Sequence, residues 1–172
     1  ELKASGVAAV VWSDWGAFKM EAYDNTTYNA RLLMEAGVVT SLHSDNAEIS
    51  TRMNWEAGKL LRTGVDEIAA LSTVTNQSAK AIAIDSRVGS LEAGKDADFV
   101  IWNGNPLSQF TKAEQTWVDG RRYFSLDEDA ALRAETARQR AQLIQAVLAA
   151  APAENAPAGA PARPRGTEGS RR

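Results

Sequence analysis

The stretch from Val38 to Asp45 constrains the fold of this chain more than any other part of it. The stretch begins with a short β-branched run and ends in three polar residues, and a helical pattern starts almost at once after it. An acid at the carboxyl end of a strand, with a helix following, is typical of the active sites of α/β barrels. Asp45 is therefore the first candidate for a catalytic residue. The alternative is that Asp45 caps the helix by accepting a hydrogen bond from its first turn.

His43 is the only histidine of the chain. One histidine alone cannot form a metal site, since such sites need three or four converging ligands. It precedes Asp45 by two residues, which puts both side chains on one side of the strand if the strand continues that far. His43 is therefore a candidate substrate contact. A structural or supporting role is the more common one for a histidine in such a place.

The composition excludes several kinds of protein. The chain has 172 residues, of which 44% are hydrophobic and 24% charged, as in globular domains. Its net charge of -3 gives no electrostatic reason for binding nucleic acid or anionic membranes. The absence of cysteine excludes disulfides, thiolate metal ligands and a cysteine nucleophile. No apolar run approaches the roughly 20 residues of a membrane span. We therefore expect a small-molecule substrate, with no nucleic acid and no membrane span, and we leave a homo-oligomer open.

Residues 1–84 are predicted to form the parallel part of an α/β fold. The apolar run Val7–Trp12 is typical of a strand buried on both faces. A helical face follows over residues 28–36, Gly37 supplies its stop, and Val38–Leu42 forms the next strand. The short connections predict a βαβ unit with two parallel strands. The apolar spacing then predicts three further helices, over residues 49–61, from Asp66 to Leu71 and from Asn76 to Ile82.

Residues 85–125 are predicted to form a small antiparallel sheet. Phe99–Trp102 is typical of a strand, and residues 116–124 are typical of a hairpin with a type I′ turn at Asp119 and Gly120. Three strands are too few to bury both faces of a sheet. We therefore expect this sheet to pack on strands that lie outside this chain.

The C-terminal residues divide into two parts. Residues 126–150 are predicted to be helical, with arginines and acids interleaved as on a solvated face. Residues 151–172 are rich in alanine, proline, glycine and arginine and have no apolar periodicity, so we expect them to be disordered.

Five motifs make the chain resemble the amidohydrolase superfamily of metal-dependent hydrolases. They occur in the family's order and cover roughly residues 30 to 125, and together they are specific although each is weak alone. The most similar subgroup is that of the imidazolonepropionase-like enzymes. The matching segments are Ala36–Val38 with Ser44–Asp45 (the end of the eighth barrel strand), Thr73–Ala79 (a T-x-N-P-A turn, here without its Pro), Val88–Ala93 (a G-S-L-E lead-in), Gly94–Trp102 (a GKDADLV stretch) and Trp117–Arg121 (a closing hairpin).

The resemblance implies a (β/α)8 TIM barrel with a metal at its C-terminal face, plus a small antiparallel β-sandwich built from both chain ends. This sequence corresponds to a C-terminal fragment of such a protein, with barrel strands seven and eight, which explains why its sheet is incomplete. The implied organisation is the end of the hydrolase barrel over residues 1–84, the C-terminal part of a composite β-sandwich over 85–125, a C-terminal helix over 126–150 and a disordered tail over 151–172.

The resemblance also implies an activity, namely hydrolysis of a non-peptide carbon–nitrogen bond in a cyclic amide, an amidine or an N-acyl compound. Asp45 is implied to contact a divalent metal (zinc first, as one or two ions), to take a proton from metal-bound water and to hand it to the leaving nitrogen. A divalent metal lowers the pKa of water from 15.7 to about 7, and a carboxylate within reach is a competent base. The family's H-x-H pair and its other ligands have no counterpart here, so we expect the isolated chain to be inactive.

Two residues that follow the acid, Asn46 and Arg52, are further candidate substrate contacts, as is Asp14 at the end of the first strand. A solvated helix arginine is the more common role for Arg52. Two other functions stay open: a non-catalytic scaffold with the same fold, and a self-standing binding domain. The lack of cysteine and the resemblance to exported bacterial relatives favour a periplasmic or secreted location over a cytoplasmic one. Because half a barrel leaves strand edges open, we also expect poor folding of the chain alone.

Overall fold

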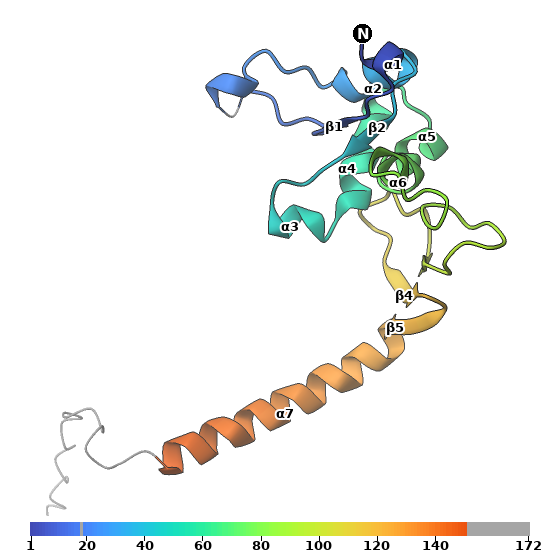
Figure 1. Ribbon diagram of the computed structural model, residues 1–172. Coiled ribbons are helices and arrows are strands. Elements are labelled where there is room, and N and C mark those ends of the chain that lie inside the picture. The colour runs from blue at the N-terminus through green and yellow to red at the C-terminus, as the bar shows by residue number, and fades with distance from the viewer. Residues whose placement is uncertain (18, 151–172) are drawn as a thin grey trace, which may run out of the picture. The chain divides into compact units, whose positions relative to one another are not determined.

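The computed structural model of the chain describes residues 1–17 and 19–150 (Figure 1). The chain divides into two compact units, Glu1–Ala130 and Ala131–Arg172. The first unit contains a parallel strand pair with helices and an antiparallel sheet, so the α/β class is confirmed. The finer division at residue 84 stays a prediction, and the tail over 151–172 lies outside the described residues.

The parallel pair consists of β1 (Ala9–Val11) and β2 (Thr40–Leu42), joined through α2 (Asn29–Glu35). The predicted βαβ unit with parallel strands is thereby confirmed. Both strands are shorter than predicted, since residues 7, 8 and 12 and residues 38 and 39 lie outside the paired strand segments. The prediction of short connections was wrong between β1 and α2, where a long loop contains the η1 turn (Met20–Ala22). Figure 1 shows this loop as a blue excursion between the two elements.

Local sequence signals fix the ends of the first helices. The short α1 (Leu2–Ser5) ends at Gly6, and α2 ends before Gly37, which has a φ of 76°. At the end of α2 the N–H of Val38 bonds to the carbonyl of Leu33 at 3.0 Å. A glycine in the left-handed region with this bond is the usual way to stop a helix, so the predicted role of Gly37 is confirmed.

The helices after β2 are shorter and more numerous than predicted. The helix predicted over 49–61 is interrupted because the hydroxyls of Ser50 and Thr51 donate to the carbonyls of Ala47 and Glu48, both at 2.7 Å. Such local bonds compete with helix continuation. The predicted cap at Asp66 is confirmed, since its Oδ1 accepts from the N–H of Ala69 at 2.9 Å. The helical segments are α3 (Ala47–Ser50), α4 (Met53–Lys59), η2 (Leu60–Thr63), α5 (Glu67–Ser72) and α6 (Asn76–Ala81).

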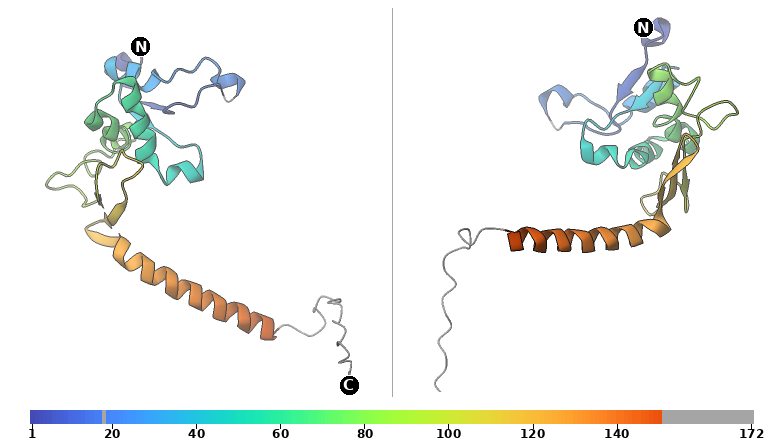
Figure 2. Two further views of the ribbon diagram at one scale, coloured as in Figure 1. Left: turned by 180° about the vertical axis from the view of Figure 1, so that it is seen from behind. Right: turned by 60° about the horizontal axis from the view of Figure 1, so that its bottom comes forward.

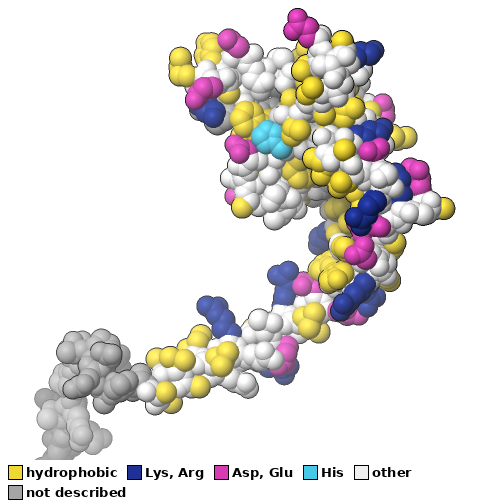
Figure 3. Space-filling view, in the orientation of Figure 1, with side chains coloured by type: hydrophobic (Ala, Val, Ile, Leu, Met, Phe, Trp, Pro, Cys, Tyr) yellow, Lys and Arg dark blue, Asp and Glu magenta, His cyan; other side chains and the backbone are white. Residues whose placement is uncertain are grey.

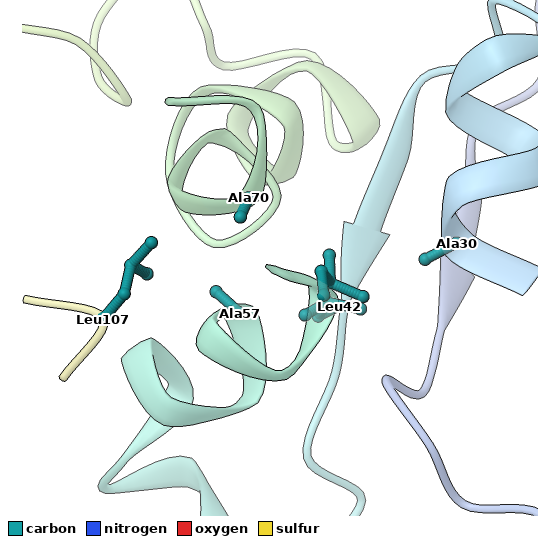
Figure 4. Packing of buried hydrophobic residues seen from close by; sticks show 6 residues of the cluster. Ala30, Leu42, Ala57, Ala70 and Leu107 are labelled. Carbon is teal, nitrogen blue, oxygen red and sulfur yellow. The ribbon is translucent and has the colours of Figure 1, made fainter. Parts of the chain in front are cut away.

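A small hydrophobic core holds these helices against β2 (Figure 4). It includes Leu107 from the loop after β3, so this loop packs on the helices. Gly58 in α4 makes that contact possible, because a Cβ there would lie 2.6 Å from the carbonyl oxygen of Leu107. The buried members of the cluster are Ala30, Leu42, Ala57, Leu60, Ala70 and Leu107.

The antiparallel sheet has the order β3 (Phe99–Trp102), β4 (Ala113–Val118) and β5 (Arg121–Ser125). Asp119 and Gly120 link β4 to β5 with φ values of 49° and 71°. Positive φ at both central residues defines the type I′ turn, so the predicted hairpin and its turn are confirmed. Several large apolar side chains of this sheet are exposed in the chain by itself.

The last described element is α7 (Leu126–Ala150), an uninterrupted helix in both views of Figure 2. The helix predicted over 126–150 is confirmed, and none of its residues is buried. Within the described part of the chain, no helix combines the length and the apolar character that crossing a membrane requires.

Candidate functional site

The candidate site lies at the carboxyl ends of β1 and β2, which meet because the strands are parallel. Val11 pairs with Leu42, and the N–H of His43 continues the ladder with a 3.2 Å bond to the carbonyl of Val11. Leu42 faces the helices in the hydrophobic core, and Val11 packs against that core. Successive side chains of a strand alternate between faces. Trp12 and His43, each one residue further along, therefore belong to the opposite face of the pair.

Asp45 has an unusual backbone conformation three residues after the end of β2. Its φ is 47°, in the left-handed region that costs an L-residue about 1 to 2 kcal/mol. Its side chain is exposed, and it forms no hydrogen bond or ion pair with any residue in 1–17 or 19–150. Aspartate enters this region more readily than most residues, but the carboxylate gains nothing from the chain in return. No local contact of the Asp45 side chain compensates for this backbone strain.

The alternative role of Asp45 as a helix cap is wrong, because Asn46 takes that place. The Oδ1 of Asn46 accepts from the N–H groups of Glu48 at 2.7 Å and of Ile49 at 3.1 Å. These bonds satisfy two donors at the start of α3. They also employ the amide oxygen of Asn46, so its contact with a substrate, which stays a prediction, would fall to the amide nitrogen.

Arg52 is held by its own helical neighbours. Its guanidinium donates to Glu48 at 3.2 Å, one helical turn earlier, and lies 5.6 Å from the ring centre of Trp55. Both contacts are those of an arginine on a solvated helix face, which was the more common alternative. Binding of an anionic substrate group by Arg52 stays a prediction.

His43 belongs to an aromatic cluster that also contains Trp12 and Trp15. The rings of Trp12 and His43 are 5.0 Å apart, and those of Trp12 and Trp15 are stacked at 5.7 Å. The strand ends at Leu42, so the condition for placing His43 and Asp45 on one side of a continuing strand is not met. Trp12 and His43 instead line a hollow of about 340 Å³ that also contains Val10, Asn25 and Asn29.

A polar network joins the end of β1 to α4 on the helix side of the pair. Ser13 and Glu56 are buried, and the Ser13 hydroxyl donates to Glu56 at 2.5 Å. The Lys59 ammonium lies 2.9 Å from an oxygen of Glu56 and 2.9 Å from an oxygen of Asp14. Arg62 donates to the other oxygen of Asp14 at 2.9 Å. Asp14, considered from the sequence as a substrate contact, is thus engaged by two cations.

The network shifts two pKa values. Burial raises the pKa of Asp14, but hydrogen bonds from Lys59 and Arg62, together with their charges, outweigh burial and hold this pKa below its ordinary value. Burial lowers the pKa of Lys59, but hydrogen bonds to Glu56 and Asp14 and their charges outweigh it and raise this pKa. Both groups are therefore held in their charged forms, and the network ties the loop after β1 to the helix that follows Asp45.

Sequence reasoning missed this network and the partner of His43. Glu56 and Lys59 are spaced as an ordinary surface pair on a helix, and Ser13 and Asp14 look like a strand terminator. Nothing in the sequence connects these two pairs, since they are more than 40 positions apart. The burial of Glu56 on α4 would have indicated the network, but the sequence alone does not show that this acid is buried.

The described residues do not complete a metal site. Among residues 1–17 and 19–150, no group of three or more His, Cys, Asp or Glu side chains is placed to hold an ion. The exposed carboxylate of Asp45 fits a divalent cation as one oxygen donor. Any further ligands would come from residues outside the described part of the chain.

The fold and the position of Asp45 define an α/β protein whose candidate functional groups gather where its parallel strands end. The sequence model of the amidohydrolase family matches residues 3–122. The chain belongs to the amidohydrolase family. The predicted resemblance is confirmed at this level, while the imidazolonepropionase-like subgroup stays a prediction.

Several known proteins are similar to this chain. Amidohydrolase tasK of Hapsidospora irregularis is 32% identical over 118 residues, which are 68% of this chain and 12% of tasK. The crystal structure of an amidohydrolase from Thermotoga maritima is 30% identical with a TM-score of 0.67, over 72% of this chain and 33% of that one. An adenosine deaminase from Xanthomonas campestris with bound zinc has the same fold, with 18% identity, a TM-score of 0.51 and coverage of 80% and 38%. This chain thus spans 12% of its curated relative and 33% to 38% of these two structures.

Proposed function

We propose that this chain is the C-terminal part of a metal-dependent hydrolase that cleaves a non-peptide carbon–nitrogen bond, with Asp45 as its acid and base. The observation that carries the proposal is the place of Asp45 just after the parallel strand β2, with a carboxylate that is exposed and unengaged by residues 1–17 and 19–150. Its positive φ adds support, because backbone strain of this kind clusters at functional sites. Membership of the amidohydrolase family supports the same conclusion.

The proposed fold of the whole protein is a (β/α)8 barrel in which β1 and β2 are strands seven and eight. The parallel pairing of these strands and the helices that cover one of their faces support this placement. The sheet of β3, β4 and β5 then supplies the C-terminal share of a β-sandwich. The exposed apolar side chains of this sheet fit a partner sheet from the rest of the protein.

The proposed cofactor is a divalent metal, with zinc expected, and the Asp45 carboxylate is one of its ligands. The zinc bound in the similar adenosine deaminase supports this choice of metal. When bound, the ion lowers the pKa of a water molecule toward neutrality. The Asp45 carboxylate then accepts the proton of the attacking water and delivers it to the nitrogen as the carbon–nitrogen bond breaks. The substrate class is a cyclic amide, an amidine or an N-acyl compound.

The test uses the protein expressed from its whole reading frame. Metal content and hydrolysis of a panel of cyclic amides and N-acyl compounds are compared between the native protein, Asp45→Asn and Asp119→Asn. Asp119 is a matched control, because it is also exposed and has a φ of 49° but lies in the hairpin turn. We expect bound metal and turnover in the native protein and in D119N, and loss of turnover in D45N. Absence of bound metal in metal-replete medium would instead support a non-catalytic scaffold.

A further inference from the structure

We propose that the hollow beside the end of β2 binds a planar ring of the substrate, with Trp12 and His43 as its aromatic wall. This inference rests on the proposed hydrolase function and narrows its substrate class. The substrate would carry a flat ring with hydrogen-bonding groups on its edge, such as an aryl amide or an unsaturated cyclic amide. Four residues carry the argument: Trp12, His43, Asn25 and Asn29.

The wall is formed on the face of the strand pair that the hydrophobic core does not use. Leu42 points into the core, whereas Trp12 and His43 lie on the opposite face, with their rings 5.0 Å apart. Trp15 stacks behind Trp12 at 5.7 Å and limits its movement. Figure 3 shows the chain's one histidine at the surface, next to hydrophobic side chains. A planar ring binds such a wall through offset stacking, which a puckered ring of the same size cannot match.

Two side-chain amides that line the hollow can form hydrogen bonds. They belong to Asn25 and Asn29, and both side chains are half-buried. Among residues 1–17 and 19–150, neither of these side-chain amides forms a hydrogen bond. An amide group offers two donors and an acceptor, and a half-buried amide gains from a partner. The pair therefore suits the polar edge of a ring that stacks on the aromatic wall.

The hollow also has a suitable size and position for a substrate of Asp45. Its volume of about 340 Å³ lies in the range of small-molecule sites. His43 precedes Asp45 by two residues, so their Cα atoms are separated by at most about 7 Å. Asp45 does not itself line the hollow, so an amide group attached to the bound ring would extend past His43 toward the acid. The aromatic wall would favour substrates with a planar ring over those with a puckered ring, a preference that the Asp45 carboxylate alone cannot provide.

The experiment measures binding of two matched amides, benzamide and cyclohexanecarboxamide, to the protein expressed from its whole reading frame. The two compounds carry the same amide group on rings of similar size, of which only the first is planar. Isothermal titration calorimetry, with tryptophan fluorescence as a second readout, gives the dissociation constants. We expect benzamide to bind about five- to tenfold more tightly, as one aromatic contact allows.

Four variants test whether the hollow is the place where benzamide binds. Trp12→Leu is expected to remove the preference for benzamide, and Trp12→Phe to retain it. Trp55→Leu, which removes a tryptophan outside the hollow, is the control and should keep the preference. Should Trp12→Leu fail to fold, Asn29→Ala leaves the aromatic cluster intact and is expected to weaken benzamide about fivefold through loss of a hydrogen bond.

Each outcome decides the inference separately from the proposed function. Equal affinities for the two amides, binding of neither, an unchanged preference in Trp12→Leu, or an unchanged affinity for benzamide in Asn29→Ala would each overturn the ring subsite. These measurements need no turnover, so they stand even where D45N and the native protein hydrolyse the same compounds equally. Conversely, loss of turnover in D45N with no preference for benzamide would retain the hydrolase and reject the ring subsite.

Discussion

Replacing Lys59 by methionine tests whether the polar network stabilises the site. The Lys59 ammonium contacts both Asp14 and Glu56, at 2.9 Å each. Methionine has a similar length and keeps the apolar contacts of the lysine stem. The substitution therefore removes the charge and leaves the Glu56 side chain, which is 7% exposed, without its cation.

The expected loss of stability follows from the burial of Lys59 and Glu56. Removing one partner of a buried ion pair costs about 3 to 5 kcal/mol. The side chain of Lys59 is 32% exposed, so water partly replaces its interactions, and we expect a loss of about 2 to 3 kcal/mol in the free energy of unfolding. Arg62→Met is the matched control, because Arg62 binds the same Asp14 with a side chain that is 66% exposed. An exposed pair contributes only about 0.5 kcal/mol.

The assay is urea unfolding of the whole protein at neutral pH, followed by tryptophan fluorescence. Trp12 and Trp15 lie next to the network in the sequence, so this signal reports on the site. The double variant Glu56→Met with Lys59→Met removes both charges, while Ser13 keeps Asp14 as an acceptor at 3.3 Å. It should recover at least half of the loss. Equal destabilisation by K59M and R62M would refute the claim that burial makes Lys59 the stabilising cation.

Three further predictions follow from other contacts. The stability difference between the native protein and K59M should shrink below about pH 4, because Asp14, whose pKa is lowered in the fold, becomes protonated. It should also shrink above about pH 10, because Lys59, whose pKa is raised in the fold, loses its proton. Urea midpoints measured across this pH range test both changes. Gly58→Ala should lower the free energy of unfolding by about 1 to 3 kcal/mol, because the added Cβ would lie 2.6 Å from the backbone carbonyl oxygen of Leu107. Gly104→Ala is the control, since the atom nearest to its added Cβ is the side-chain hydroxyl of Thr111, at 3.1 Å. The isolated chain should bind a hydrophobic dye and unfold without a sharp transition, since many large apolar side chains are exposed; a cooperative thermal transition would contradict this.

The parts of the fold that local patterns encode were predictable from the sequence. The stop at Gly37, the cap at Asp66 and the turn at Asp119 and Gly120 each depend on residues within a few positions. The parallel pairing of β1 and β2 followed from two apolar runs separated by a helical pattern. The long loop after β1 was not predicted, because its residues have no periodicity that indicates a regular element.

The groups of the site were predictable only as far as they lie on one short stretch. Asp45 and His43 follow a strand that the sequence reveals, so their candidacy needed no tertiary information. The pairing of Lys59 with Asp14 depends on how α4 packs against the end of β1, and the contact of His43 with Trp12 depends on the register of two strands. Contacts of this kind are set by tertiary packing, which neither spacing nor composition determines.

The conformation of Asp45 distinguishes a folding role from a functional one. Two nearby polar residues have a clear role in the fold: Asp66 caps α5, and Asn46 caps α3. Asp45 has no such role, since its carboxylate contacts no described residue while its backbone adopts a φ of 47°. Glycine would fit this backbone without strain, so the fold alone does not require an acid here. Asp119 has a similar φ in a hairpin turn, so the place of Asp45 after a buried parallel strand, rather than its φ alone, supports the proposed role of its carboxylate as the base of hydrolysis.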